Sequence, residues 1–106
     1  MRKAIILYKD EAAGELIQLD DGTFIFRYFD AWMDNDKKPP IGLALSKNKQ
    51  EYKSTNLFPF FYNLLPEGSN KKTVARNLNI EENDDFSILI ATGKYDTNGA
   101  ITIMRN

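Results

Sequence analysis

The chain has 106 residues, of which 42% are hydrophobic, and this length predicts one globular domain spanning residues 1–106. Its 14 lysines and arginines nearly balance 15 aspartates and glutamates, so the chain lacks the basic excess that phosphate-gripping proteins carry. Cysteine and histidine are both absent, which excludes disulfides, thiol catalysis and the Ser-His and HExxH arrangements. The first apolar run, residues 4–7, is too short for a signal peptide or a membrane span, and we expect a cytoplasmic protein.

The first third of the chain predicts an antiparallel meander of three strands. Residues 4–8 form a β-branched apolar run, and residues 14–19 form a second candidate strand. Between this strand and the next, residues 20–22 read Asp-Asp-Gly, a signal for a tight turn. Residues 23–28 alternate strictly and place three aromatic side chains on one face: Phe24, Phe26 and Tyr28.

The next segment predicts shorter elements. We expect a helical turn over residues 29–33, which contains the only tryptophan, Trp32. Pro39 and Pro40 then favour extended backbone. A strand is expected over residues 41–45, followed by a charged loop over residues 46–53.

The densest apolar run, LFPFFYNLLPEGSN, covers residues 57–70. Asn56 is a credible N-cap for a helix there, because Pro59 then falls in the first turn. Its large side chains sweep about 160° of the helix, more than a helix needs in order to rest on a sheet. Two interpretations remain open: the run fills a core, or part of it forms a surface that a partner covers.

The last third predicts two further helices and a strand. Pro66 and Gly68 end the apolar helix, and Ser69 or Asn70 is expected to cap the next helix, in which Val74 and Leu78 share a face. Asp84 or Asp85 caps a third helix over residues 86–92, which Gly93 stops, although its isoleucines favour a strand. Residues 98–99 turn the chain into a last strand over residues 100–104. The fold class is therefore α+β: a small, twisted, mostly antiparallel sheet with two or three helices on one side.

Two kinds of chemistry need consideration. Carboxylates are abundant, but most fall in turns or at helix starts, where capping and the helix dipole favour them. A small hydrolase with paired carboxylates remains an alternative, and it predicts an Asp or Glu with a raised pKa in a cleft. Residues 68–72, Gly-Ser-Asn-Lys-Lys, could hold an anion at a helix start, but they do not form a P-loop. We interpret Lys71 and Lys72 as a solvated face. Together with Arg76 they form only a small basic patch, and we expect no direct nucleic-acid binding, no metal and no cofactor.

Six short matches in order resemble the N-terminal subdomain of HipA-type serine/threonine kinases, the toxins of HipBA toxin–antitoxin modules. FPFFYNLLPEG, at residues 58–68, resembles the family signature FFxNLLPE/D. The other five segments are similar to the family's GEL hairpin, F-x-Y…W-L segment, PLSLSLP, PFxLL and VGAVxL: residues 14–16, 26–33, 40–45, 86–89 and 99–103. The sequence departs from the family at Ser46, where a proline is expected, and at residues 92–98 in the glycine region. The family's catalytic core follows this subdomain, so its catalytic residues have no counterpart within these 106 residues.

The resemblance implies a non-catalytic antitoxin similar to HipS, the separate subunit that restrains the kinase HipT in three-gene HipBST systems. The implied partner is a HipT/HipA-type kinase, with a HipB-like DNA-binding protein in a larger complex and no membrane. We predict that the partner-binding residues are Asn63, Glu67, Gly68, Ser69, Asn70, Lys72 and Arg76. Two further alternatives remain: an excised N-terminal piece of an ordinary HipA kinase, and an interaction or assembly module that binds a kinase without inhibiting it.

Overall fold

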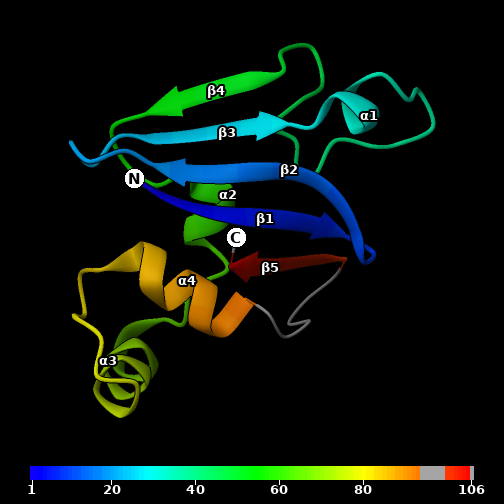
Figure 1. Cartoon of the computed structure of the whole chain (residues 1–106). Helices are drawn as coiled ribbons and strands as arrows, with labels where there is room; N and C mark the ends of the chain where they lie inside the picture. Colours follow the sequence, from blue (N-terminus) through cyan, green and yellow to red (C-terminus); the bar gives the residue numbers. More distant parts are fainter. Residues whose placement is uncertain (94–99, 106) are drawn as a thin grey trace.

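The computed structural model of the chain describes residues 1–93 and 100–105 and has five strands and four short helices in this part (Figure 1). In chain order they are β1 (Arg2–Tyr8), β2 (Glu11–Gln18), β3 (Phe24–Tyr28), α1 (Asp30–Met33), β4 (Glu51–Ser54), α2 (Pro59–Tyr62), α3 (Gly68–Asn77), α4 (Asp85–Gly93) and β5 (Ile101–Arg105). The strands form one sheet in the order β4-β3-β2-β1-β5, and every neighbouring pair is antiparallel. The predicted α+β class and the opening meander are confirmed.

Two tight turns build the meander. Lys9 and Asp10 join β1 to β2 with φ angles of 48° and 67°, the positive values that a two-residue type I′ turn requires. In the predicted turn between β2 and β3, Gly22 has a φ of 90°, and the N–H of Leu19 donates to the carbonyl of Thr23 at 2.8 Å. These turns fix the register that separates the two faces of the sheet.

One face of the sheet carries the core. The predicted aromatic row of β3 is buried there, and the helices supply Phe61 from α2 and Phe86 from α4. In Figure 1, α2 lies behind the strands and α4 lies beside β5. Trp32 packs against Tyr8 with ring centroids 5.5 Å apart, and its indole N–H donates to the carbonyl of Pro39 at 2.9 Å. Trp32 is therefore a core residue.

The strand predicted over residues 41–45 is wrong, because these residues form a turn. The hydroxyl of Tyr28 accepts the N–H of Ile41 at 2.9 Å and donates to the carbonyl of Leu45, so a side chain satisfies groups that a strand would have paired. The fourth strand is instead β4, which begins within the segment predicted to be a charged loop, residues 46–53, and ends one residue beyond it. Tyr52 packs against the core and Lys53 is exposed, so the alternation of a half-buried strand is present but masked by charge.

The helix predicted over the apolar run is much shorter in the structure. It covers only Pro59–Tyr62 as α2, and Phe58 occupies the N-cap position expected for Asn56. The core interpretation of the run is nevertheless confirmed for four of its side chains: Leu57, Phe58, Phe61 and Leu65. Tyr62, in contrast, is 55% exposed.

The last two helices test the predicted caps. Helix α3 begins at Gly68 with Glu67 in the N-cap position, so the cap predicted at Ser69 or Asn70 is wrong. Its buried residue is Ala75, while Leu78 is exposed. The helix predicted over residues 86–92 is confirmed as α4, Asp85–Gly93, and three of its side chains are buried in the core: Phe86, Ile88 and Leu89. The last strand is confirmed as β5, and the turn predicted at residues 98–99 lies outside the described residues.

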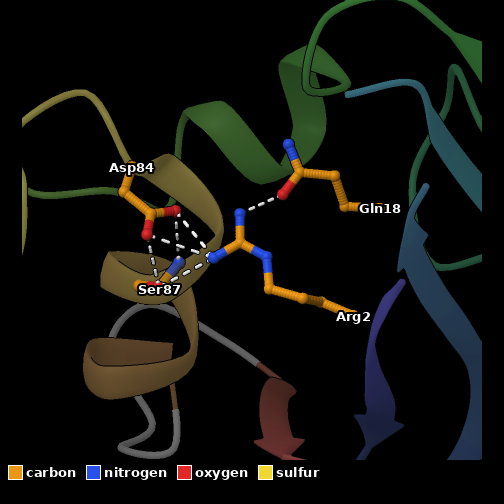
Figure 2. A network of polar contacts seen from close by, with 4 residues as sticks. All are labelled: Arg2, Gln18, Asp84 and Ser87. Atoms are coloured by element: carbon orange, nitrogen blue, oxygen red, sulfur yellow. Dashed lines mark hydrogen bonds and ion pairs between the residues drawn. The ribbon is translucent and has the colours of Figure 1, made fainter. Parts of the chain in front are cut away.

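A polar network ties β1 to the start of α4 (Figure 2). The guanidinium of Arg2 donates to Asp84 at 3.1 Å, to the hydroxyl of Ser87 at 2.9 Å and to the side-chain oxygen of Gln18. Asp84 also accepts the backbone N–H and the hydroxyl of Ser87 at 3.3 Å and 2.7 Å, which confirms it as the cap of α4. Burial alone would raise the pKa of Asp84, but the hydrogen bonds from Ser87 and Arg2 outweigh it and hold that pKa below its ordinary value.

Candidate partner-binding surface

The predicted surface begins at the turn that connects α2 to α3. Asn63 ends α2, and its N–H donates to the carbonyl of Pro59 at 3.0 Å. The N–H groups of Leu64 and Leu65 then donate to the carbonyls of Phe61 and Tyr62, and these hydrogen bonds form two tight turns. Because Leu65 is buried, it anchors the turn to the core, while Asn63 remains exposed.

Glu67 and Gly68 give the turn its shape. Glu67 is extended, with φ of −105° and ψ of 149°, and the next residue, Gly68, has a φ of 54°. No heavy atom lies within 4 Å of the place where a Cβ of residue 68 would stand. Glycine therefore suits this position because of its left-handed backbone conformation, and not because of crowding.

Three of the seven predicted residues border one shallow hollow of about 240 Å³. These residues are Asn63, Glu67 and Gly68, and the rest of its lining comes from Tyr62, Leu65, Pro66 and Lys71. The structure thus brings the polar end of α2 and the start of α3 together around a single depression, with Leu65 and Pro66 as its apolar part.

The other four predicted residues lie along α3 and do not line this hollow. Ser69, Asn70, Lys72 and Arg76 are all exposed. The backbone carbonyl of Ser69 accepts the hydroxyl of Thr73 at 2.9 Å, and the N–H of Asn70 donates to the carbonyl of Glu67 at 3.0 Å. All four therefore belong to the exposed surface of α3.

Tyr62 and Lys71 border the hollow but were not among the predicted contacts. The ammonium of Lys71 lies 2.7 Å from a carboxylate oxygen of Asp85 and 6.0 Å from the ring centroid of Tyr62. The hydrogen bond to Asp85 raises the pKa of Lys71, against the opposing effect of its partial burial. Lys71 is therefore an ion-paired link between α3 and α4. The sequence signal for it was the acidic start of α4, fourteen positions further on.

The alternative of a small hydrolase predicts an Asp or Glu with a raised pKa, but the two carboxylates whose pKa is shifted have a lowered one. Asp84 borders a second, polar hollow of about 630 Å³, and its pKa lies below the ordinary value. The pKa of Asp21 is also lowered, because its carboxylate accepts hydrogen bonds from Thr23. Across residues 1–93 and 100–105, no three acidic side chains converge on a possible metal site. Among the same residues, no helix is long and apolar enough to cross a membrane.

A five-stranded antiparallel sheet with a few short helices defines a small α+β fold. The sequence model of the family described as the HipA N-terminal domain matches residues 4–104, and the chain belongs to this family. A solved structure of the N-terminal domain of HipA toxin superposes with a TM-score of 0.74 at 26% identity, covering 100% of this chain and 93% of that one.

Two curated relatives are much longer than the part that matches this chain. The "Putative kinase Y4mE" of Sinorhizobium fredii is 31% identical over 91 residues, which is 86% of this chain and 21% of the relative. The "Putative kinase Y4dM" of the same organism is 31% identical over 99 residues, covering 88% of this chain and 24% of the relative. This chain thus spans about a quarter or less of these two relatives. An uncharacterized protein of Haemophilus influenzae is 34% identical over 55 residues, and that match covers 52% of each chain.

Proposed function

We propose that this chain is a non-catalytic antitoxin that binds a HipT/HipA-type serine/threonine kinase in the cytoplasm and inhibits it. The single observation that carries the proposal is the distribution of the family match. The HipA N-terminal domain accounts for residues 4–104 of this chain, whereas the kinase-named relatives align over only 21% and 24% of their own length. The kinase activity is then a property of the part that this chain does not match.

The Haemophilus influenzae relative supports the idea that the domain acts as a separate polypeptide. Because the match covers an equal share of both proteins, that relative is close to this chain in length. A domain that packs on a kinase in a fused protein keeps a complementary surface when it is made separately. Binding energy can then hold the kinase in one conformation, which is a population shift toward the inactive state.

The turn between α2 and α3 supplies the proposed contact. Asn63, Glu67 and Gly68 border the hollow of about 240 Å³. Ser69 and Asn70 continue the exposed surface, and Lys72 with Arg76 add polar contacts at its rim. A HipB-like DNA-binding protein is the further partner in a larger complex.

A second candidate function is a non-inhibitory assembly module at the N-terminus of a HipA-type kinase. The small fraction of the kinase-named relatives that this domain covers favours it, because in those proteins the domain accompanies a much longer chain.

Kinase autophosphorylation, measured with and without the purified chain, separates the two functions. An antitoxin suppresses phosphate incorporation in proportion to complex formation and rescues cells from kinase toxicity. If the chain co-purifies with the kinase while phosphorylation continues at the original rate, the assembly function stands and the antitoxin function fails.

A further inference from the structure

The face of the sheet opposite the core carries aliphatic side chains on four of its five strands. Along each strand, the residues that alternate with buried ones point to this side. We call the aliphatic residues among them the aliphatic face: Ile5, Leu7, Ile17, Ile25 and Met104. None of them belongs to the buried core or packs against it. Figure 1 looks onto this side of the sheet, with α2 behind the strands and none of the described helices in front of them.

Strand register joins these side chains into one band across four strands. Ile17 of β2 lies opposite Ile25 of β3, and Ile5 of β1 lies opposite Met104 of β5. Ile5 lies opposite Glu15, and Ile17 is two residues further along β2, so Ile5 and Ile17 are diagonal neighbours. Leu7 is the next outward residue after Ile5 along β1. The band is therefore continuous from β3 to the edge strand β5.

Ordinary strand preferences do not account for the whole band. An antiparallel sheet with one solvated face normally alternates apolar and polar residues. Isoleucine favours strands for its shape, which explains single positions such as Ile25. Leucine and methionine lack that advantage, yet Leu7 continues the band and Met104 is 49% exposed at its border. Ile5, Leu7, Ile17 and Ile25 are half-buried and Met104 is exposed, and within residues 1–93 and 100–105 no core residue packs on them. Such a band indicates a surface that another protein covers.

Charge and chain direction indicate what covers the band. Lys3 lies opposite Ile17, at the margin of the band, and makes no ion pair with any described residue. A carboxylate on the covering surface would therefore find a cation beside the aliphatic side chains. The matched domain ends at residue 104, on β5, and in the HipA family it is an N-terminal domain. In Y4mE about 79% of the chain lies outside the part that matches this chain. The polypeptide that follows the N-terminal domain thus leaves it from the border of the aliphatic face.

We propose that the aliphatic face is a docking surface for the HipA-type kinase, with an apolar patch on the kinase packed over Ile5 and Ile17 and an acidic side chain facing Lys3. The identity of the partner rests on the proposed function, but the location of this interface does not depend on the turn between α2 and α3. The kinase is then held at two places on different sides of the small domain.

The test replaces Ile5 and Ile17 together by threonine, which keeps the β-branched shape that strands favour and removes apolar contact. The matched control is Leu43→Thr, because Leu43 is 101% exposed on the turn of residues 41–45, away from this face. Binding to a purified HipA-type kinase is measured by calorimetry on the full chains. We expect the double variant to lose about tenfold or more in affinity and Leu43→Thr to bind like the wild type.

A second measurement needs no substitution. Oxidation of Met104 by dilute peroxide, followed by mass spectrometry, should slow several-fold when the kinase is bound, while Met33 on α1 keeps its own rate. Undiminished affinity of a folded double variant, or an unchanged rate at Met104 in the complex, overturns the docking surface. A wild-type dimer that the double variant dissociates, with kinase binding intact, assigns the face to a second copy and also overturns it.

The outcomes separate this inference from the proposed function. If the kinase binds and protects Met104 but remains active, the docking surface stands and the antitoxin function fails. If the variant at residues 5 and 17 binds normally and the kinase is still inhibited, the antitoxin function stands and the docking surface fails. If the wild-type chain does not bind the kinase at all, both are overturned.

Discussion

The phenolic oxygen of Tyr28 lies 2.9 Å from the backbone nitrogen of Ile41 and accepts its hydrogen bond. The same hydroxyl donates to the carbonyl of Leu45, so one side chain from β3 closes both ends of the turn between these residues. Within that turn, a Cβ on Gly42 would stand 2.6 Å from the ring of Phe60. The turn is therefore fixed to the central sheet by a hydroxyl and to α2 by the close approach of a glycine.

Tyr28→Phe should destabilise the domain by about 1–3 kcal/mol, because it leaves a buried donor and a buried acceptor without partners. The free energy of unfolding is measured by urea denaturation monitored at Trp32. Tyr62→Phe is the matched control, since Tyr62 is 55% exposed, and it should change stability by less than about 0.5 kcal/mol. Equal stability of the two variants would show that the Tyr28 hydroxyl does not hold the turn.

This hydroxyl also explains where prediction from the sequence failed. Residues 41–45 alternate like a strand, and no local pattern shows that an aromatic residue thirteen positions earlier satisfies the backbone of Ile41. Conversely, β4 has charged residues at Glu51 and Lys53, and these side chains masked the inward position of Tyr52. The meander was predictable because its turns and its alternation are both local, whereas the fourth strand depends on pairing with β3.

Lys71→Met should destabilise the domain by about 1 kcal/mol, while Lys72→Met on the same helix should have little effect. The two positions differ in environment: Lys71 and Asp85 are only 19% and 24% exposed and are ion-paired, whereas Lys72 is exposed. Thermal unfolding of both variants is the measurement. A similar loss at both positions would mean that the charge of α3 matters, and not the link to α4.

The free energy of unfolding at acidic pH should depend on the carboxylate of Asp84. Its pKa is lower in the folded chain than the ordinary value of about 3.9, so its carboxylate stabilises the fold at higher pH. This contribution is fully present above about pH 4 and is lost as pH falls through the lower folded-state pKa. Urea denaturation of the wild type and of Asp84→Asn, measured from pH 6 down to pH 2, should give curves that converge in acid.

At neutral pH, Asp84→Asn should cost about 1 kcal/mol, since it removes the ion pair with Arg2 and one of the two carboxylate oxygens, whereas asparagine can still cap the helix. Ser87→Ala removes one of the hydrogen bonds to the same carboxylate and should therefore reduce the acid-dependent loss without abolishing it. Parallel curves for wild type and Asp84→Asn across this range would contradict the assignment.

Gly68→Ala should destabilise the domain by about 1 kcal/mol, whereas Gly68→Asn should cost less. The φ of 54° is unfavourable for alanine, and asparagine tolerates the left-handed region better. Because no atom lies within 4 Å of the added Cβ, a difference between the two variants reports backbone conformation alone. If asparagine is the worse of the two, the left-handed conformation is not what selects glycine here.

The candidate surface was predictable only in part. The sequence places Asn63 and Glu67 close to Pro66, which ends the predicted apolar helix, and the structure brings both residues to one hollow. Tyr62 was inconspicuous among neighbouring aromatics, since exposure in a four-residue helix depends on which side faces the core. Lys71 borders the hollow and is ion-paired with Asp85, fourteen positions further on, so its environment depends on how α3 and α4 pack together.

The turn itself is tested by Glu67→Arg combined with Ser69→Arg, which should lower the affinity for the HipA-type kinase about tenfold or more. Both residues are exposed, so the double variant should fold normally, and a binding loss then reports the surface. Asp36→Arg with Asn48→Arg is the matched control, because it changes the net charge by the same amount at two exposed loop positions. Calorimetric titration of each variant with the kinase gives the comparison. A loss shared by both double variants would indicate a general charge effect, while undiminished binding of the first would remove the turn from the interface and leave the aliphatic face to account for docking.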